Sequence, residues 1–286
     1  MKILITGSNG QLGSELKKAS ATAPEFKNIG QIFFNDVDTL DICDIEAVED
    51  FLEKNRIDVL VNCAAYTAVD KAESDVEQCY RINSDAVKNL VLAAKKFETK
   101  LIHISTDYVF DGRAYIPYTE EVTINPQSIY GKSKAEGEAI ISKLYAENSV
   151  IIRTSWLYSN FGNNFVKSMI RIGMERNAVS VVFDQIGTPT NAADLANAIL
   201  HIINTNVFKS GIYHYSNEGV CSWYDFAKEI FRQNKIDCKV LPIESKDYPV
   251  PAPRPHYSVL NKSKIKNTYG LEILHWQESL NQYLKP

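Results

Sequence analysis

A tyrosine and a lysine lie four residues apart in the stretch YGKSK, as Tyr130 and Lys134. In a helix this spacing places both side chains on one face. An ammonium group near a phenol favours the phenolate, so we expect Lys134 to lower the pKa of Tyr130 from about 10. Tyr130 would then suit a general acid that protonates a carbonyl oxygen. Because this spacing also arises by chance, the chemistry needs a nucleotide site and a third polar group nearby.

Two hydroxyl residues, Ser105 and Thr106, are candidates for the third group. They end the apolar run KLIHIST, which is followed by DYVFDG. In open α/β sheets, ligands bind in the crevice at the carboxyl ends of the strands. A hydroxyl group there can hydrogen-bond a substrate carbonyl and share its developing negative charge. Side-chain alternation alone does not decide which of the two faces the crevice.

A glycine-rich turn follows the first apolar run of the chain. The stretch ILITGSNGQLG contains Gly7, Gly10 and Gly13 in GxxGxxG spacing, which differs from the GxGxxG fingerprint. Glycine allows a tight turn and the close approach of a pyrophosphate, and the following helix start offers free N–H groups to that anion. An ordinary strand–helix turn would also explain a lone glycine pattern. Its place in the first βαβ unit favours a dinucleotide site.

An acidic residue, Asp36, ends the second apolar run, at about the distance from the glycines where a carboxylate binds the adenosine ribose. A strand-capping aspartate is the alternative. Val37 follows it, with no arginine beside it to pair with a 2′-phosphate, so we expect NADH or NADPH with a slight preference for NADH. Asp41 and Ile42 flank the adenine or form a surface turn, and Lys134 can hold the nicotinamide ribose.

The elements that must position these residues alternate between strand and helix. Short apolar runs, which read as strands, occupy 2–6, 31–36, 58–65, 100–106 and 149–155. Helix-like segments occupy 11–19, 45–55, about 74–97, and a stretch that begins near 130. Runs that are apolar on both faces are typical of a parallel sheet covered on both sides. We therefore predict an α/β fold with a Rossmann-type, doubly wound parallel sheet.

The pattern changes after about residue 156. Loops lengthen, and Pro and Tyr accumulate in KDYPVPAPRPHYSVL, residues 246–260. We predict a dinucleotide-binding domain over 1–155 and a smaller substrate-binding lobe over 156–286. The segments 179–204 and 211–214 are expected to rejoin the sheet of the first domain. A chain of 286 residues is long enough for both parts.

Composition excludes several classes of protein. Hydrophobic residues make up 45% of the chain, charged residues 23%, and the net charge is −4 with no basic stripe for nucleic acid. No apolar run is long enough to span a membrane, and the start MKILITG reads as a strand rather than a signal peptide. Five cysteines without a CxxC pair favour a reducing compartment, so we expect a cytoplasmic protein. The scattered histidines predict no metal site.

The motifs together resemble a known family. GxxGxxG, NCAA, the strand-end Ser-Thr and Tyr-x-x-x-Lys occur in the order typical of the extended short-chain dehydrogenases/reductases. Within that family the chain is similar to the dTDP-4-dehydrorhamnose reductases, in AAYTAVDKAE, STDYVFDG, NPQSIYGKSKAEGE, RTSWLY, GNNFV, DQIGTPT and RPHYSVLN. The resemblance covers essentially the whole chain. It implies NAD(P)H-dependent reduction of dTDP-4-dehydro-β-L-rhamnose to dTDP-β-L-rhamnose, the last step of dTDP-rhamnose biosynthesis, which serves bacterial surface polysaccharide.

The resemblance also implies roles for single residues. The catalytic set would be Thr106, Tyr130 and Lys134. The cofactor would contact Gly10, Gln11 and Leu12 at its pyrophosphate, and Ala65, Tyr66 and Thr67 further along, although relatives often have His in place of Tyr66. The sugar nucleotide would contact Asp107, Trp156, Asn164 and Arg254. Core packing is the alternative for Trp156, whereas a guanidinium held among prolines suits a diphosphate.

Some relatives are described as dimers bridged by Mg²⁺ through glutamates. Glu15 matches one such position, but Ala193 replaces another, so we assign no metal ligand and keep Mg²⁺ only as an option. The chain would be a monomer or a homodimer. Two other functions stay open, since fold alone does not decide function. One is a nucleotide-sugar epimerase or dehydratase of the same fold, and the other is a non-catalytic regulatory subunit. The intact catalytic set argues against the second.

Overall fold

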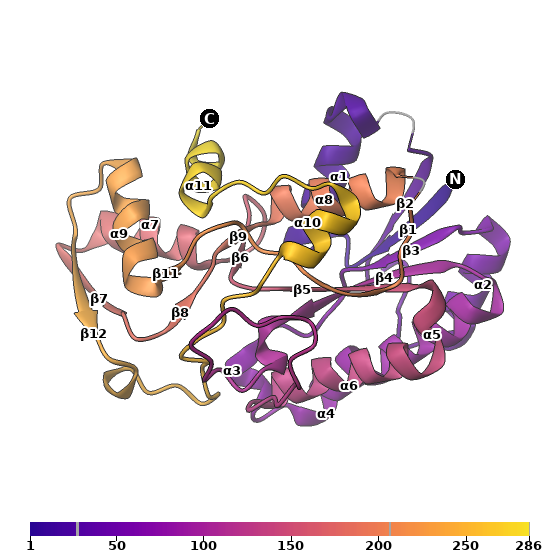
Figure 1. Cartoon of the computed structure of the whole chain (residues 1–286), viewed down its shortest axis with the longest axis horizontal. Helices are drawn as coiled ribbons and strands as arrows, with labels where there is room; N and C mark the ends of the chain where they lie inside the picture. Colours follow the sequence, from indigo (N-terminus) through magenta and orange to yellow (C-terminus); the bar gives the residue numbers. More distant parts are fainter. Residues whose placement is uncertain (27–28, 206, 286) are drawn as a thin grey trace.

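The computed structural model describes residues 1–26, 29–205 and 207–285. Its centre is a six-stranded parallel sheet in the order β10-β5-β4-β3-β1-β2 (Figure 1). The strands are β1 (Lys2–Thr6), β2 (Gln31–Asn35), β3 (Val59–Asn62), β4 (Lys100–Thr106), β5 (Ser149–Thr154) and β10 (Gly211–His214). The chain adds strands on one side of β1 and then on the other, so a crevice opens at the carboxyl ends of β1 and β3. The predicted α/β, Rossmann-type fold is confirmed.

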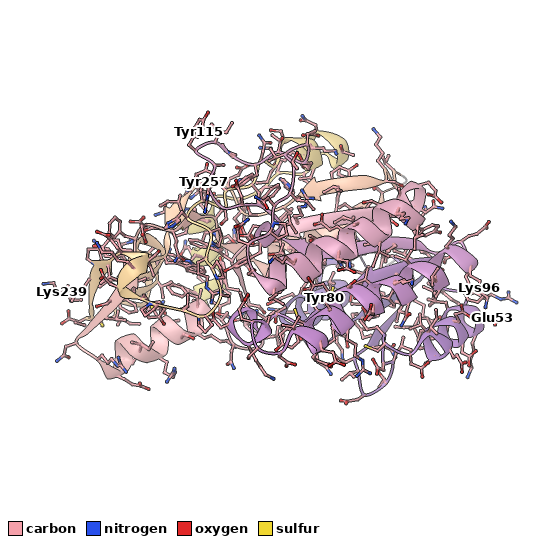
Figure 2. The ribbon with its side chains drawn as sticks, turned by 90° about the horizontal axis from the view of Figure 1, so that it is seen from below. Glu53, Tyr80, Lys96, Tyr115, Lys239 and Tyr257 are labelled. Atoms are coloured by element: carbon pink, nitrogen blue, oxygen red, sulfur yellow. The ribbon has the colours of Figure 1, made fainter. Side chains whose placement is uncertain are left out.

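Helices cover both faces of this sheet, which explains why its strands are apolar on both sides. One face carries α1 (Gln11–Thr22), α8 (Ala192–Asn204) and α10 (Ser263–Tyr269). The other carries α2 (Ile45–Asn55), α5 (Ala86–Lys96) and α6 (Ile129–Leu144). Along β1, Ile3 and Ile5 pack into the first layer and Leu4 into the second. Figure 2 shows the second layer from below, with Glu53 and Lys96 at the end of the molecule far from Lys239.

The expected single helix over about 74–97 is interrupted. The structure has α3 (Val69–Ala72), α4 (Val76–Tyr80), a π-helical turn (Arg81–Asp85) and then α5. The wider turn directs Asn83 and Ser84 into the interior, where both are buried. Isolated π-helical turns are rare and often lie at functional sites.

The C-terminal part forms a separate apolar cluster at the opposite end of the molecule from β2 (Figure 1). It contains α7 (Phe165–Glu175), β7 (Ala178–Val182), α9 (Trp223–Asn234), β12 (Lys239–Ile243) and α11 (Trp276–Leu284). Of the two segments expected to rejoin the sheet, 211–214 does so as β10. The strand in 179–204 does not, because β7 pairs in parallel with β12, while α8 packs over the sheet.

Short elements connect the two parts. Strand β6 (Leu157–Tyr158) pairs with β9 (Thr190–Asn191), and β8 (Ile186–Gly187) pairs with β11 (Cys221–Ser222). Short 3₁₀ turns lie at Pro24–Phe26, Asp107–Val109, Ala146–Asn148 and Ser245–Asp247. Across the described ranges, every helix is too short or too polar to cross a membrane.

Candidate active site

The glycine loop between β1 and α1 has no room for larger side chains. Gly7 has a φ of +65°, and a Cβ added there would lie 2.5 Å from the backbone nitrogen of Ala64. A Cβ on Gly13 would lie 2.4 Å from the carbonyl oxygen of Gly7. Gly10 caps α1 without any side-chain hydrogen bond to the first N–H groups. The loop is therefore a close-packed backbone cradle, and the uncapped first N–H groups of α1 at its end fit a pyrophosphate.

A cavity of about 510 Å³ lies beside this loop, at the carboxyl end of β2. It is lined by residues of the loop, of 36–43, of 63–65 and of the α4–π-turn region: Gly7, Asn9, Gly10, Asp36, Val37, Leu40, Asp41, Ile42, Cys43, Cys63, Ala64, Ala65, Gln78, Arg81 and Ile82. Asp36 accepts hydrogen bonds from the backbone of Asn9 and of Val37, both at 2.8 Å. The structure thus places Asp36, Asp41 and Ile42 together where an adenosine would fit. It also adds Arg81, a cation that sequence reasoning missed.

A second cavity, of about 530 Å³, continues from the first across the ends of β3, β4 and β5. Gly7, Gly10, Cys63 and Ala65 line both cavities. The second cavity also contains Gln11, Leu12, Gly13, Thr67, Val69, Ile104, Ser105, Thr106, Asp107, Tyr108, Tyr130, Lys134, Thr154, Ser155, Trp156, Leu157, Gly162 and Asn163. The three residues of the expected catalytic set therefore meet in one crevice with the glycine loop.

Tyr130 is a buried residue at the start of α6, where Ser128 caps the helix through the N–H of Gly131. Burial raises the pKa of Tyr130 above its ordinary value, and a hydrogen bond with Thr106 opposes this rise. The ring of Tyr130 packs edge to face on Tyr108, with the centroids 5.5 Å apart. The Tyr130 phenol is thus held in its protonated form beside the Thr106 hydroxyl, which settles that Thr106, and not Ser105, faces Tyr130.

Lys134 is held away from the role that we expected for it. Its Nζ donates to the carbonyl of Ile104 at 2.6 Å and lies 3.3 Å from Nε2 of His103. Burial lowers the pKa of Lys134 to about 8, although Glu138 raises it. The expectation that the pKa of Tyr130 is lowered is wrong for this geometry, because burial raises it and Nζ of Lys134 is directed to Ile104 and His103.

A buried ion pair lies one helical turn beyond Lys134. Glu138 accepts from Nε of Arg153 at 2.9 Å and from Nη2 at 2.6 Å, and both side chains are only 3% exposed. The hydroxyl of Ser105 also donates to Glu138, at 2.5 Å. Ser105 is therefore bonded to Glu138 on α6 rather than directed at Tyr130. The spacing Tyr130–Lys134–Glu138 repeats every four residues and was a signal in the sequence for this third position.

Asn83, from the π-helical turn, joins the 65–67 loop to α6. Its amide accepts from the backbone N–H of Tyr66 at 2.9 Å and donates to the Tyr66 carbonyl at 3.0 Å. The same amide donates to Ser133 at 3.0 Å, between Tyr130 and Lys134. Ala65 and Thr67 line the crevice, whereas the hydroxyl of Tyr66 points to Asp75, at 3.1 Å.

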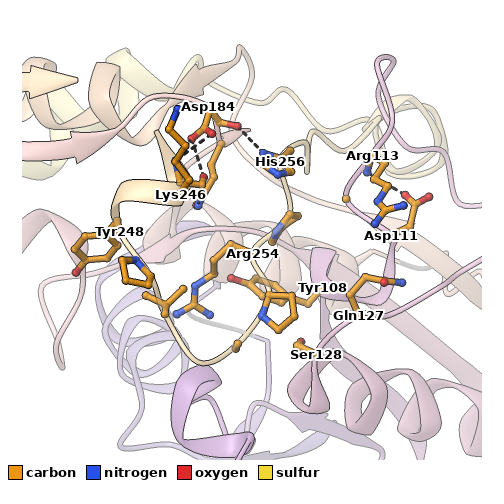
Figure 3. A pocket seen from close by; sticks show the side chains of 18 of the residues that line it. Tyr108, Asp111, Arg113, Gln127, Ser128, Asp184, Lys246, Tyr248, Arg254 and His256 are labelled. Atoms are coloured by element: carbon orange, nitrogen blue, oxygen red, sulfur yellow. Dashed lines mark hydrogen bonds between the residues drawn. The ribbon is translucent and has the colours of Figure 1, made fainter. Parts of the chain in front are cut away.

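A third cavity, of about 640 Å³, meets the crevice at Tyr108 (Figure 3). In Figure 3, Arg254 lies between Tyr248 and Tyr108, and Asp184, Lys246 and His256 form another wall. Arg254 donates to Asp70 at 2.6 Å. A hydrogen bond with Arg254 also lowers the pKa of Tyr108, which burial raises to about 12. This cavity therefore presents an oriented guanidinium beside the crevice.

The other expected substrate residues are placed differently. Burial raises the pKa of Asp107 to about 6, against hydrogen bonds with Ser258 and Thr106, and Asp107 lines the crevice. Trp156 lines the crevice and also stacks on Trp223, with ring centroids 3.6 Å apart, so it packs between the lobes as well. Asn164 caps α7 and donates to Gln11 at 3.1 Å; its neighbour Asn163 lines the crevice instead.

Glu15 lies inside its own chain, 2% exposed, where the hydroxyl of Ser159 donates to it at 2.8 Å. Among the residues whose placement is described, no group of three or more His, Cys, Asp or Glu residues is arranged to hold a metal ion.

Comparisons with known proteins agree with this geometry. The family model described as "RmlD substrate binding domain" matches residues 1–286. The chain is 38% identical to the spore coat polysaccharide biosynthesis protein SpsK of Bacillus subtilis, over 99% of this chain and 97% of SpsK. It is 39% identical to the dTDP-4-dehydrorhamnose reductase of Aggregatibacter actinomycetemcomitans, over 98% of this chain and 97% of that protein.

A solved structure is similar over the same length. It is the dTDP-4-dehydrorhamnose reductase of Bacillus anthracis in complex with NADP, with a TM-score of 0.92 and 40% identity over 99% of this chain and 98% of that one. The chain therefore belongs to the RmlD family, the family of the dTDP-4-dehydrorhamnose reductases.

Proposed function

We propose that this chain reduces the C4 ketone of dTDP-4-dehydro-β-L-rhamnose to give dTDP-β-L-rhamnose, with NADH or NADPH as the reductant. One observation carries the proposal. Thr106, Tyr130 and Lys134 meet in the crevice that lies between the glycine loop and the third cavity, which contains Arg254. Full-length similarity to reductases of this name supports it. The product would serve polysaccharide synthesis, and the relative SpsK is named as a spore coat polysaccharide biosynthesis protein.

The chain's own residues fit a nicotinamide dinucleotide. The glycine cradle suits its pyrophosphate, and the first cavity, which is lined by Asp36, suits its adenosine. When bound, the dinucleotide supplies the hydride. Asp36 favours an unphosphorylated ribose, whereas Arg81 offers a cation to a 2′-phosphate from the same cavity. We propose that the chain accepts both coenzymes, with a slight preference for NADH.

Tyr130 acts as the general acid in this proposal. Because burial keeps its phenol protonated, Tyr130 can donate a proton to the C4 oxygen as hydride arrives at C4. The Thr106 hydroxyl orients that oxygen and shares its negative charge. Lys134 leaves the Ile104 carbonyl to hold ribose hydroxyls. Tyr130 then regains its proton from water.

The substrate would lie between the two parts of the chain. We propose that residues 1–155 hold the dinucleotide and that residues 156–286 supply most of the sugar-nucleotide site. Arg254 would bind the diphosphate, with Asp107 and Trp156 near the sugar. Asn164 would act indirectly, through Gln11 and the start of α7. The engaged, buried Glu15 argues against a bridging Mg²⁺.

One assay tests the function. Purified protein is mixed with NADH or NADPH and freshly prepared dTDP-4-dehydro-β-L-rhamnose, with and without EDTA, and absorbance is followed at about 340 nm, the band of the reduced nicotinamide. We expect one reduced coenzyme to be consumed per product, with no loss on chelation. Product formation without net coenzyme consumption would instead indicate an epimerase or dehydratase. Absence of turnover together with tight association with another enzyme would indicate a regulatory subunit.

A further inference from the structure

A buried chain of hydrogen bonds runs across three neighbouring strands and ends at Lys134. The hydroxyl of Thr6 on β1 donates to Oδ1 of Asn62 on β3, at 2.8 Å. Nδ2 of Asn62 lies 3.0 Å from Nδ1 of His103 on β4. Nε2 of His103 lies 3.3 Å from Nζ of Lys134 on α6. All four side chains are buried, and none of the first three reaches the expected substrate.

The partners of this chain fix the proton on His103. The backbone N–H of Ala64, which can only donate, bonds Oδ1 of Asn62 at 3.1 Å. Oδ1 is therefore the acceptor end of the amide, and Nδ2 must donate to Nδ1 of His103. A neutral imidazole that accepts at Nδ1 carries its proton on Nε2. That N–H points at Nζ of Lys134, so it favours the amine of Lys134 and opposes its ammonium form.

The same chain starts at the nucleotide cradle. Thr6 directly precedes Gly7, and Ala64, which fixes the Asn62 amide, lies against Gly7 so closely that a Cβ on Gly7 would be 2.5 Å from its nitrogen. A shift of the glycine loop would therefore displace His103 through two hydrogen bonds, Thr6 to Asn62 and Asn62 to His103.

We propose that His103 is a positioning residue for the reaction, held by Asn62 in its Nε2–H form so that it sets both the place and the proton of Lys134. The catalytic role of His103 rests on the proposed function. The structural content of the inference, the tautomer of His103 and its hold on Lys134, is independent of the substrate.

The surroundings of Lys134 are consistent with such control. The titratable groups that face it come from four elements or their ends: Glu138 on α6, His103 on β4, Cys63 after β3 and Cys79 on α4. Burial lowers the pKa of Lys134 to about 8, and Glu138 opposes this. Burial and Lys134 both lower the pKa of His103, so the ring stays neutral. Lys134 is thus poised to change its charge near neutral pH.

Nitrogen NMR of the histidine-labelled protein reads the tautomer directly. We expect the His103 signals, assigned with His103→Gln, to show a neutral ring protonated on Nε2 at every pH from about 5 to 9. An imidazolium, or a ring protonated on Nδ1, would overturn the proposal. This measurement needs no variant that has to retain activity.

A substitution at Asn62 then tests the hold on Lys134. Asn62→Asp keeps the size of the side chain but offers only acceptors to Nδ1, so the His103 proton should move to Nδ1 and Nε2 should accept from the ammonium. We expect the Lys134 midpoint, followed by ¹³C NMR of its Cε, to rise by about one pH unit, because Nε2 then accepts and because the new carboxylate also favours the ammonium. His103→Met, which removes the opposing N–H, should also raise it. If the Lys134 midpoint is unchanged in each of these two variants that folds, the inference is refuted.

Asn55→Asp is the matched control, since the Asn55 amide donates to the Phe51 carbonyl within α2. It should leave the Lys134 midpoint unchanged. In the assay, the alkaline limit of kcat/KM should move with the midpoint in Asn62→Asp. If the parent lacks reductase activity while the NMR results hold, only the proposed function fails. If activity is present and the midpoints do not move, only the role of His103 fails.

Discussion

Arg254 and Asp70 form an ion pair that links the third cavity to the cofactor side of the crevice. Nη2 of Arg254 donates to Oδ2 of Asp70 at 2.6 Å, and the backbone N–H of Ala252 donates to Oδ1 at 3.3 Å. Asp70 lies in α3, directly after the 65–67 loop. The residue that we assign to the diphosphate is therefore oriented by a carboxylate 184 positions away in the sequence.

Loss of this pair should weaken binding of the sugar nucleotide. We expect Arg254→Ala to raise its KM by about 10- to 100-fold, since a hydrogen bond to a charged group contributes about 1.5–3 kcal/mol. Asp70→Asn, which only loosens the guanidinium, should raise KM by about 3-fold. The KM of NADH should not change. Arg232→Ala is the control, because Arg232 forms an equally short ion pair with Glu229 on α9; unchanged kinetics in Arg254→Ala would contradict the assignment.

Removal of the Tyr130 hydroxyl should stop the chemistry without unfolding the protein. We expect Tyr130→Phe to lower kcat by about 10²- to 10⁴-fold, because a general acid contributes that much, and Thr106→Val to lower it by about 10²-fold. Phe fills the same buried space, so the melting temperature should stay close to that of the parent. Tyr145→Phe, at the far end of α6, serves as the control. A parental rate in Tyr130→Phe would remove the proton donor from the proposal.

Lys134 should lower the free energy of unfolding at neutral pH. Its pKa in the folded protein, about 8, lies below the ordinary 10.5, so the unfolded chain binds more protons between these values and the fold gains stability as pH rises through them. We therefore expect Lys134→Met to melt at a higher temperature than the parent at pH 7, with a difference that shrinks toward pH 10.5. Thermal melts across this range measure it, and a destabilised Lys134→Met at pH 7 would show that the bond to Ile104 outweighs the burial of charge.

The choice of coenzyme should depend on two side chains of one cavity. We expect Arg81→Ala to lower kcat/KM for NADPH by about 3- to 10-fold, a modest effect because Arg81 is exposed. The value for NADH should change by less than about 2-fold. Asp36→Asn should shift the ratio in the opposite direction, toward NADPH. Steady-state rates with both coenzymes decide this, and an unaltered ratio in both variants would exclude Arg81 and Asp36 from the choice.

The sequence alone was sufficient for the fold and for the local parts of the site. The alternation of strands and helices, the glycine loop and the Tyr130–Lys134 face could be predicted because each depends on spacing within one segment, which backbone hydrogen bonds and side-chain size control. The ends of parallel strands share one edge, so the meeting of a strand-end hydroxyl, from Ser105 or Thr106, with these residues also followed.

The partners that give these residues their chemistry were decided only by the tertiary structure. Lys134 faces His103 and Ile104 rather than controlling the pKa of Tyr130, and Arg81 reaches the adenosine cavity through a π-helical turn. Likewise, β7 pairs with β12 instead of rejoining the sheet. Each of these contacts joins segments far apart in the chain, and their geometry depends on how whole layers pack. The spacing of residues within one segment does not predict how layers pack. Burial and hydrogen bonds in the folded protein determine these contacts.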